Sequence, residues 1–177
     1  MTGPDAVPAT APRARDVFGS PVHLLAFGFG AGLAPRAPGT FGTLVGIPLW
    51  WTLSHCAPFV YAGVTVLLFV VGCSVCGASS RRLGVHDYGG IVFDEVIGYV
   101  IAAAPLLLLP MPWMAWKGAI AAFALFRLFD VWKPWPIRHL DQYVEGGFGI
   151  MLDDAVAAVF AAAALMIGLR WAPVVFS

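Results

Sequence analysis

Apolar residues run in five long blocks along the chain, separated by short breaks rich in proline, glycine and charge. The blocks are residues 41–57, 59–78, 96–109, 113–129 and 155–175. A helix that crosses a bilayer needs about 20 residues, with roughly 17 as the lower limit. The second and fifth blocks are long enough, the first and fourth are borderline, and the third needs residues 91–93 as well. No segment alternates like a strand, so the pattern predicts an all-α, membrane-embedded bundle of about five main apolar helices.

The segments before the first block have a different character. Residues 23–33 are apolar but too few to span a bilayer, and we expect them to lie at the interface or to re-enter it. Residues 1–20 contain proline, glycine and alanine with Arg13 and Arg15, but no apolar core. They predict a disordered N-terminal segment rather than a signal peptide. Residues 21–177 are then expected to form a single helical membrane domain.

Composition supports the membrane interpretation. The chain is 60% apolar and 11% charged, with a mean hydropathy of +0.84, whereas about a quarter of the residues of a soluble domain are charged. The formal net charge is zero, and nucleic-acid binding, which needs a strongly basic face, is not expected. Three cysteines in apolar stretches, Cys56, Cys73 and Cys76, do not make a disulfide framework. No pattern indicates an oligomer.

The basic residues predict an orientation. If the amino terminus is cytoplasmic and five helices run up and down, eight basic residues fall on the cytoplasmic side and two on the other, as the positive-inside rule requires. The eight are Arg13, Arg15, Arg36, Arg81, Arg82, Arg127, Lys133 and Arg138, and the two are Lys117 and Arg170. Tryptophans near block ends favour the membrane interface, namely Trp50, Trp51, Trp113, Trp116 and Trp171.

Acidic residues occur at three block ends that an up-and-down bundle brings to one face. Asp94 and Glu95 precede the third block, Asp130 ends the fourth, and Asp153 and Asp154 precede the fifth. Crowded carboxylates repel one another, and sites made only of oxygen favour Mg²⁺, Mn²⁺ or Ca²⁺ over zinc. We therefore predict a divalent-cation site formed by Asp94, Glu95, Asp130 and Asp154. Asp153 points about 100° away from Asp154 on a helix, so the two are not expected to share one ion.

Simpler roles for these acids remain open. They could form ion pairs with Arg127, Lys133 and Arg138, and Asp153 could cap the start of a helix. Lys133 follows Asp130 by three residues and would share a helix face with it if the helix extends that far. Lys133 and Arg138 could also hold phosphate oxygens.

Two further sequence patterns resemble phosphate sites. The glycine-rich segment 28–42 ends in Pro38-Gly39-Thr40, and its backbone N–H groups could bind an anion, although such glycines often serve close helix packing. Cys76 and Arg82 have the spacing of a cysteine-phosphatase loop. An apolar helix end followed by a basic turn is the interpretation we favour there, since apolar burial weakens a thiol nucleophile.

Four stretches together resemble the phosphatidylglycerophosphatase A family. They are Gly32-Leu-Ala-Pro-Arg-Ala-Pro-Gly-Thr-Phe-Gly-Thr-Leu44, Ile91-Val-Phe-Asp-Glu-Val-Ile-Gly98, Phe126-Arg-Leu-Phe-Asp-Val-Trp-Lys-Pro-Trp-Pro-Ile-Arg138 and Gly146-Gly-Phe-Gly-Ile-Met-Leu-Asp-Asp154. They cover about a third of the chain in the order and spacing of the family. The one departure lies after Pro-Gly-Thr, where Phe41-Gly42-Thr43 replaces the usual Gly-Ser and keeps a hydroxyl.

The resemblance implies an all-helical enzyme of the bacterial inner membrane that uses Mg²⁺ to convert phosphatidylglycerophosphate to phosphatidylglycerol. It implies catalytic roles for Asp94, Glu95, Asp130, Lys133, Asp153 and Asp154, with Asp87 as a further acid of the pattern. We expect Arg36, Thr40, Lys133 and Arg138 to bind the substrate at the cytoplasmic face.

The reaction could proceed by direct attack of water or through an aspartyl-phosphate. The alternatives to this activity are a phosphatase for another lipid or a small phosphomonoester, a small ion-conducting protein and a structural membrane subunit.

Overall fold

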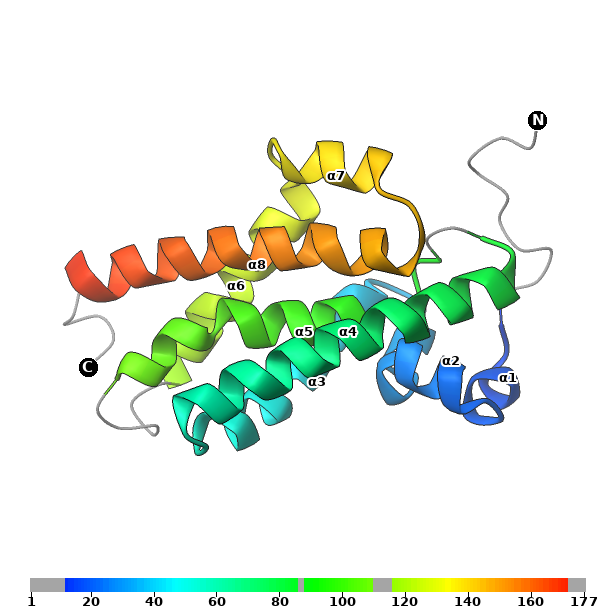
Figure 1. The fold of residues 1–177 in the computed structure, drawn as a ribbon, viewed down its shortest axis with the longest axis horizontal. Helices are drawn as coiled ribbons and strands as arrows, with labels where there is room; N and C mark the ends of the chain where they lie inside the picture. The colour runs from blue at the N-terminus through cyan, green and yellow to red at the C-terminus, as the bar shows by residue number, and fades with distance from the viewer. Residues whose placement is uncertain (1–11, 86–87, 110–115, 172–177) are drawn as a thin grey trace.

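The computed structural model describes residues 12–85, 88–109 and 116–171, and every regular element in these ranges is helical (Figure 1). The prediction of an all-α fold is therefore confirmed. In chain order the elements are α1 (Ala14–Phe18), α2 (Pro21–Ala26), the 3₁₀ helix η1 (Gly28–Leu33), α3 (Pro38–Ser54), α4 (Pro58–Leu83), α5 (Phe93–Ala102), the 3₁₀ helix η2 (Ala104–Leu108), α6 (Trp116–Trp132), α7 (Ile137–Tyr143) and α8 (Gly146–Trp171).

The apolar blocks correspond to helices, but their lengths differ from those expected. By length and hydropathy, α4 and α8, with 26 residues each, could cross a membrane. The third block is broken, because α5 has 10 residues and gives way to η2, which carries Pro105 at its start. Among the described residues, five spanning helices are not confirmed. The predicted start of the fourth block and the end of the fifth lie outside the described residues.

The N-terminal segment differs from the predicted disorder where the structure describes it. Residues 14–18 form α1, whose Val17 is fully buried beside Phe27 and Ile97. Asp16 accepts a hydrogen bond from the backbone N–H of Arg13 and so caps this short helix. Within residues 12–20 the structure therefore contains the short helix α1, while residues 1–11 lie outside the described ranges and the domain boundary stays a prediction.

Helix α5 lies at the centre of the bundle, in contact with α3, α4, α6 and α8. Small residues permit this packing: a Cβ on Gly98 would approach Phe126 Cζ of α6 to 2.4 Å, and one on Gly46 of α3 would approach Tyr99 Cβ to 3.0 Å. Ile97 and Tyr99 are fully buried. Because α5 is surrounded, the acidic residues of its first turn lie inside the protein, where their placement is fixed by packing.

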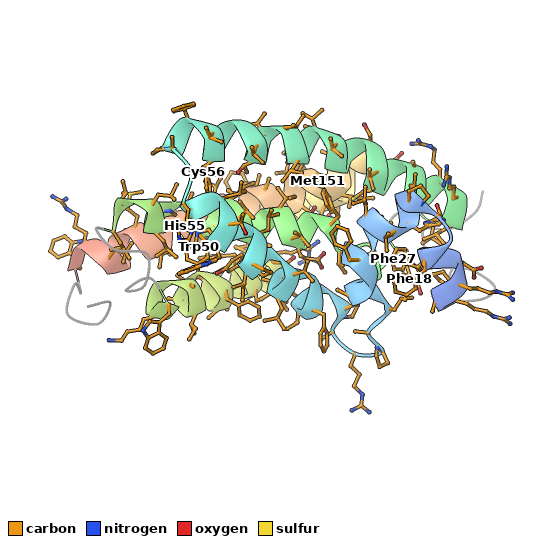
Figure 2. The ribbon with its side chains drawn as sticks, turned by 90° about the horizontal axis from the view of Figure 1, so that it is seen from below. Phe18, Phe27, Trp50, His55, Cys56 and Met151 are labelled. Carbon is orange, nitrogen blue, oxygen red and sulfur yellow. The ribbon has the colours of Figure 1, made fainter. Side chains whose placement is uncertain are left out.

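Tryptophans divide between the core and the surface. Trp51, Trp116 and Trp171 are 43%, 59% and 81% exposed, as a residue at the membrane interface would be. Trp50 is instead 3% exposed and makes an edge contact with Tyr99 (Figure 2). The interfacial prediction is wrong for Trp50, because it faces the core side of α3. Trp113 lies outside the described residues.

Candidate metal and phosphate site

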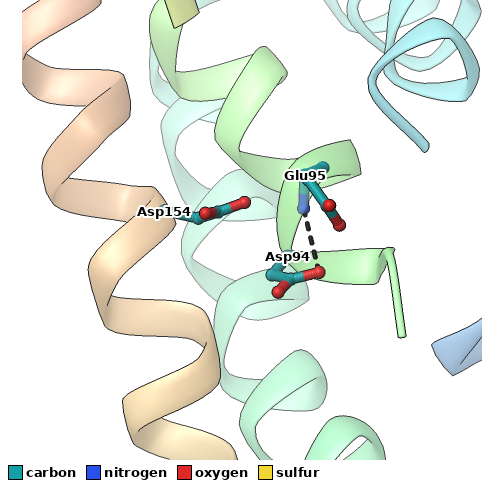
Figure 3. A group of neighbouring side chains, drawn as sticks. All are labelled: Asp94, Glu95 and Asp154. Carbon is teal, nitrogen blue, oxygen red and sulfur yellow. Dashed lines mark hydrogen bonds between the residues drawn. The ribbon is translucent and has the colours of Figure 1, made fainter. Parts of the chain in front are cut away.

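Three carboxylates meet between α5 and α8. Asp94 and Glu95 stand in the first turn of α5, and Asp154 reaches them from α8 (Figure 3). One oxygen atom from each lies within 4.8 Å of the other two. Asp94 and Asp154 are 8% and 4% exposed, and the backbone N–H of Glu95 donates to Asp94 Oδ1 at 3.1 Å. Residues 60 positions apart are thus brought together as the sequence predicted.

Local structure fixes both sides of this group. The backbone N–H of Val92, just before α5, donates to the carbonyl of Ala26 at 2.8 Å and so anchors the start of the helix to α2. On the other side, Gly147 lies against α4, where an added Cβ would come within 1.8 Å of the carbonyl oxygen of Cys73. Helix α8 begins at Gly146, seven residues before Asp153. Asp153 therefore lies inside the helix, and the prediction that it could cap a helix start is wrong.

The Pro-Gly-Thr segment forms a further wall of the site. Pro38 and Gly39 open α3 after Ala37, whose φ of 49° is left-handed. A Cβ on Gly39 would lie 2.1 Å from Glu95 Oε1 and 3.1 Å from Arg127 Nη1. Thr43 is buried and donates to the Gly39 carbonyl at 2.9 Å, which holds this turn in place. Any side chain at position 39 would displace the Glu95 carboxylate, a constraint that the sequence alone did not reveal.

Arg127 joins the acids of two helices. Its Nη1 donates to Asp130 Oδ2 at 2.5 Å and lies 3.9 Å from Glu95 Oε1. Asp130 is 9% exposed and stands outside the group of three, although it interacts electrostatically with Asp154 and Glu95. Among the ion pairs considered above for the acids, the one with Arg127 therefore forms at Asp130.

Lys133 binds a different acid from the one its spacing suggested. Helix α6 ends at Trp132 and Lys133 has a left-handed φ of 44°, so the side chain leaves the face that carries Asp130. Its Nζ donates to Asp153 Oδ2 at 2.7 Å and to Asp141 Oδ1 at 2.9 Å. Because α6 does not extend to Lys133, the condition for sharing a helix face with Asp130 is not met, and the ion pair considered for Lys133 forms with Asp153. Asp141 is a site residue that helical spacing could not reveal.

These two acids keep Lys133 charged. Burial alone would lower the pKa of the Lys133 ammonium, but Asp153 and Asp141 outweigh burial, and the pKa is raised well above its usual range. Lys133 is therefore a permanent cation beside the carboxylate group, with Asp153 as its buried counter-ion.

Two carboxylate oxygens of the site are buried and have no hydrogen-bond partner among the described residues: Glu95 Oε2 and Asp154 Oδ2. A buried acceptor without a donor costs about 1–3 kcal/mol, and more when it is charged. A cation between these oxygens would remove that cost. The donor set, oxygen atoms from three acids, fits a hard cation such as Mg²⁺.

The remaining predicted residues lie at the edges. Arg138 is exposed and lines, with Lys133, Trp135 and His139, a pocket of about 540 Å³. Thr40 is half-buried in the first turn of α3, and Arg36 is exposed in the preceding turn. The structure does not bring Arg36 to the carboxylates. Asp87 lies outside the described residues.

The cysteine spacing does not form a phosphate loop. Cys76 is fully buried inside α4 with its thiol against Met151 Sδ, and Arg82, at the end of the same helix, donates to Ser20 Oγ. The apolar-helix interpretation is confirmed for this segment.

Known proteins match the chain over most of its length. The family model described as phosphatidylglycerophosphatase A matches residues 24–169. Phosphatidylglycerophosphatase A of Escherichia coli is 43% identical over 167 residues, which cover 90% of this chain and 94% of that protein. The Haemophilus influenzae protein of the same name is 44% identical over 143 residues, covering 80% and 85%.

A third relative carries a different name. The putative phosphatidylinositol-3-phosphatase of Bacteroides thetaiotaomicron is 35% identical over 153 residues, covering 84% of this chain and 92% of that protein. No solved structure matches the chain. From the match of the family model and the two relatives of the same name, the chain belongs to the phosphatidylglycerophosphatase A family, a family of phosphoric monoester hydrolases.

Proposed function

We propose that the chain hydrolyses phosphatidylglycerophosphate to phosphatidylglycerol and inorganic phosphate. Relatives that are 43% and 44% identical are named for this activity. The observation that carries the proposal is the group of Asp94, Glu95 and Asp154, with its two buried oxygens that lack a donor. Such a group can hold a cation where a phosphate would otherwise be repelled.

Mg²⁺ is the cofactor that we propose for this group. Asp94, Glu95 and Asp154 would hold it, and Asp130 is a further candidate ligand through its interaction with Asp154. Carboxylate oxygens without histidine or cysteine favour Mg²⁺ over zinc. When bound, Mg²⁺ supplies positive charge that stabilises the phosphoryl oxygens in the transition state.

The basic side chains of the site would bind and orient the phosphate. Two of the three N–H groups of Lys133 are used by Asp153 and Asp141, which leaves one for a phosphate oxygen. Arg138 shares a pocket with Lys133 and can contact the same headgroup. Thr40 and the exposed Arg36 complete the proposed substrate-binding set from the α3 side. Fixed cations of this kind lower the barrier by holding the reacting groups in line.

The proposed chemistry is a direct displacement. The oxygen of a water molecule attacks phosphorus, the bond from phosphorus to the glycerol oxygen breaks, and a carboxylate of the group takes the proton from the water. The carboxyl group that took this proton then gives it to the leaving oxygen, which becomes the alcohol of phosphatidylglycerol. Capture of a phosphorylated Asp94 or Asp130 after rapid quenching would replace this scheme with a covalent one.

The protein is proposed to reside in the bacterial inner membrane with the site facing the cytoplasm. Helices α4 and α8 are the candidate spans. Lys117 and Arg170 stand near the start of α6 and the end of α8, whereas the site lies at the opposite ends of these helices with Arg127 and Lys133. An excess of basic residues at the site end supports a cytoplasmic position for it.

A relative named as a putative phosphatidylinositol-3-phosphatase makes another phospholipid the alternative substrate. Family membership weighs against an ion-conducting or purely structural protein, since neither accounts for the named hydrolases among the relatives.

Phosphate release from purified protein in detergent micelles tests the function. Phosphatidylglycerophosphate, phosphatidylinositol 3-phosphate and glycerol 3-phosphate are compared, each with EDTA and with Mg²⁺ restored. Release from the first, abolished by EDTA and by Asp94→Asn or Asp154→Asn, is the expected result. Asp16→Asn, an exposed acid on α1, is the matched control and should retain activity. Faster release from either other substrate would reassign the headgroup, and activity that persists in EDTA would refute the metal.

A further inference from the structure

An apolar groove runs between α3 and α6, which contact each other along part of their length. Figure 2 shows Trp50 on the side of α3 that faces this region. The groove has a volume of about 350 Å³, within the range of small-molecule pockets. Its walls carry no charged side chain and are formed by Leu44, Ile47, Trp50, Trp51, Trp116, Ala119, Ile120 and Phe123.

The helix faces that form the two walls of the groove continue toward the carboxylate site. On α3, Thr40, Leu44, Ile47 and Trp51 follow one another at helical spacing and share one face. Position 40 is adjacent to Gly39, which touches Glu95. The α3 wall of the groove, which begins at Leu44, therefore lies about one helical turn from Thr40, at the end of α3 that carries Gly39.

The residues of the α6 wall show the same helical spacing, but α6 runs toward the site whereas α3 runs away from it. Trp116, Ile120, Phe123 and Arg127 share one face of α6, and Arg127 is the residue that pairs with Asp130 and Glu95. Leu44, the α3 lining residue nearest the site, and Ile120 on the α6 wall are 44% and 60% exposed, so both walls of the groove are open to the surroundings. The polar site at one end of these helices and the open apolar groove along them match the polar headgroup and the apolar tail of a phospholipid.

A second apolar groove, between α4 and α5, lacks this connection. It has a volume of about 320 Å³ and is lined by residues that include Tyr61, Val66 and Phe69. Between it and the acids, Gly72 of α4 is packed so tightly that a Cβ would approach Met151 Sδ to 2.5 Å and Phe93 to 3.1 Å. At Gly72, α4 therefore packs directly against Phe93 and Met151, and the residues that line the α4–α5 groove do not include this position.

We infer that the groove between α3 and α6 binds an acyl chain of the lipid whose phosphate is cleaved, an inference that rests on the proposed function. A chain in the bilayer is already out of water, so the groove gains little from the hydrophobic effect. It acts through dispersion contacts and by fixing the direction in which the headgroup enters the site. A long acyl chain should therefore raise kcat/KM relative to a short one, and this effect should depend on the groove.

Filling the groove tests the inference. Ile120→Trp places an indole in the α3–α6 groove, and Val66→Trp does the same in the α4–α5 groove. The two positions are matched, at 60% and 63% exposed. The substrates are dioleoyl phosphatidylglycerophosphate in mixed micelles and the dihexanoyl form as monomers. The measured quantity is the ratio of kcat/KM for the long-chain substrate to that for the short-chain substrate.

Ile120→Trp should lower this ratio about tenfold, since the loss of some ten dispersion contacts corresponds to roughly that factor. Val66→Trp should leave it unchanged. Leu44→Trp, from the opposite wall, repeats the test and decides the outcome if Ile120→Trp does not fold. An unchanged ratio in the groove variants, or an equal fall in Val66→Trp, overturns the inference while the proposed function stands. A wild-type protein that releases no phosphate from either substrate refutes the proposed function instead, and the acyl-chain assignment with it.

Discussion

Gly39→Ala is the substitution whose effect the structure specifies most closely. The added Cβ would lie 2.1 Å from Glu95 Oε1 and 3.1 Å from Arg127 Nη1, at the point where α3 begins. Both contacts are with side chains of the site, whereas Gly39 itself belongs to a buried helical turn held by Thr43. The Glu95 carboxylate should therefore move, because the hydrogen bond from Thr43 to the Gly39 carbonyl holds the backbone of the turn in place.

The magnitude follows from the distance. Ordinary contact begins near 3.4 Å, so the carboxylate oxygen must retreat by roughly 1 Å, and a misplacement of that size costs about 100-fold in rate. The effect on stability should be smaller. Overpacking costs about 1–3 kcal/mol, and the gain of up to about 1 kcal/mol from replacing glycine by alanine in a helix offsets part of it.

The assay separates the two effects. Phosphate release from phosphatidylglycerophosphate gives kcat and KM, and thermal unfolding gives the change in stability. Gly63→Ala on α4 is the matched control, since an added Cβ there meets nothing within 4 Å and should leave kcat unchanged. Wild-type kcat in folded Gly39→Ala would refute the reasoning, because it would mean that the position of the Glu95 carboxylate does not matter for the reaction.

Three further predictions concern the metal, the lysine and the buried thiol. Removing divalent ions with EDTA should lower the unfolding temperature of the wild type, by several degrees if the dissociation constant of the ion lies well below its working concentration. The double substitution Glu95→Gln/Asp154→Asn should abolish that shift. An equal shift in the double variant would contradict the proposed metal site. Lys133→Gln should lower kcat by about two orders of magnitude and destabilise the protein by leaving Asp153 without its cation, whereas Lys117→Gln at the other end of α6 should retain kcat. The pKa of Lys133 is raised in the folded protein, so its stabilising contribution is fully present below about pH 10.4 and is lost as the pH rises further. Unfolding scans should therefore find a constant difference in stability between wild type and Lys133→Gln from pH 6 to 9. In strongly alkaline buffer this difference should narrow. Cys76→Ser should keep most of the phosphatase activity, since the thiol lies inside α4 against Met151, and a folded but inactive variant would restore the cysteine mechanism.

The sequence pattern was sufficient for the helices and for the meeting of the acids. Long apolar blocks broken at Pro58 and Gly84 correspond to α4, and the order of the blocks alone placed Asp94, Glu95 and Asp154 at one end of the bundle. These features follow from periodicity and chain direction, which are local or depend only on counting helices. The angular argument that Asp153 and Asp154 serve different partners also agrees with the structure, where Asp153 binds Lys133.

Backbone turns and helix ends did not follow from the sequence pattern. The left-handed φ of Lys133 is unusual for a residue with a side chain, and it redirects the ammonium from Asp130 to Asp153 and Asp141. Helix α8 extends two turns before its apolar block because Gly147 packs against α4, which a hydropathy pattern does not register. Each of these errors arises where tertiary packing overrides a local preference.

Charge balance in the described part of the site separates two of the five predicted acids, which pair with protein cations, from the three that we propose to hold a metal ion. Arg127 pairs with Asp130, and Lys133 pairs with Asp153 and the more exposed Asp141. Within the group of three, Glu95 has a long contact with Arg127 and one oxygen without a donor, and Asp154 has another. Three clustered negative charges exceed what one arginine can offset, since like charges at such distances are costly in a buried site. Neutralising Asp153 should therefore act through the position of Lys133, whereas neutralising Asp154 should act through cation affinity, although the two residues are adjacent in the chain.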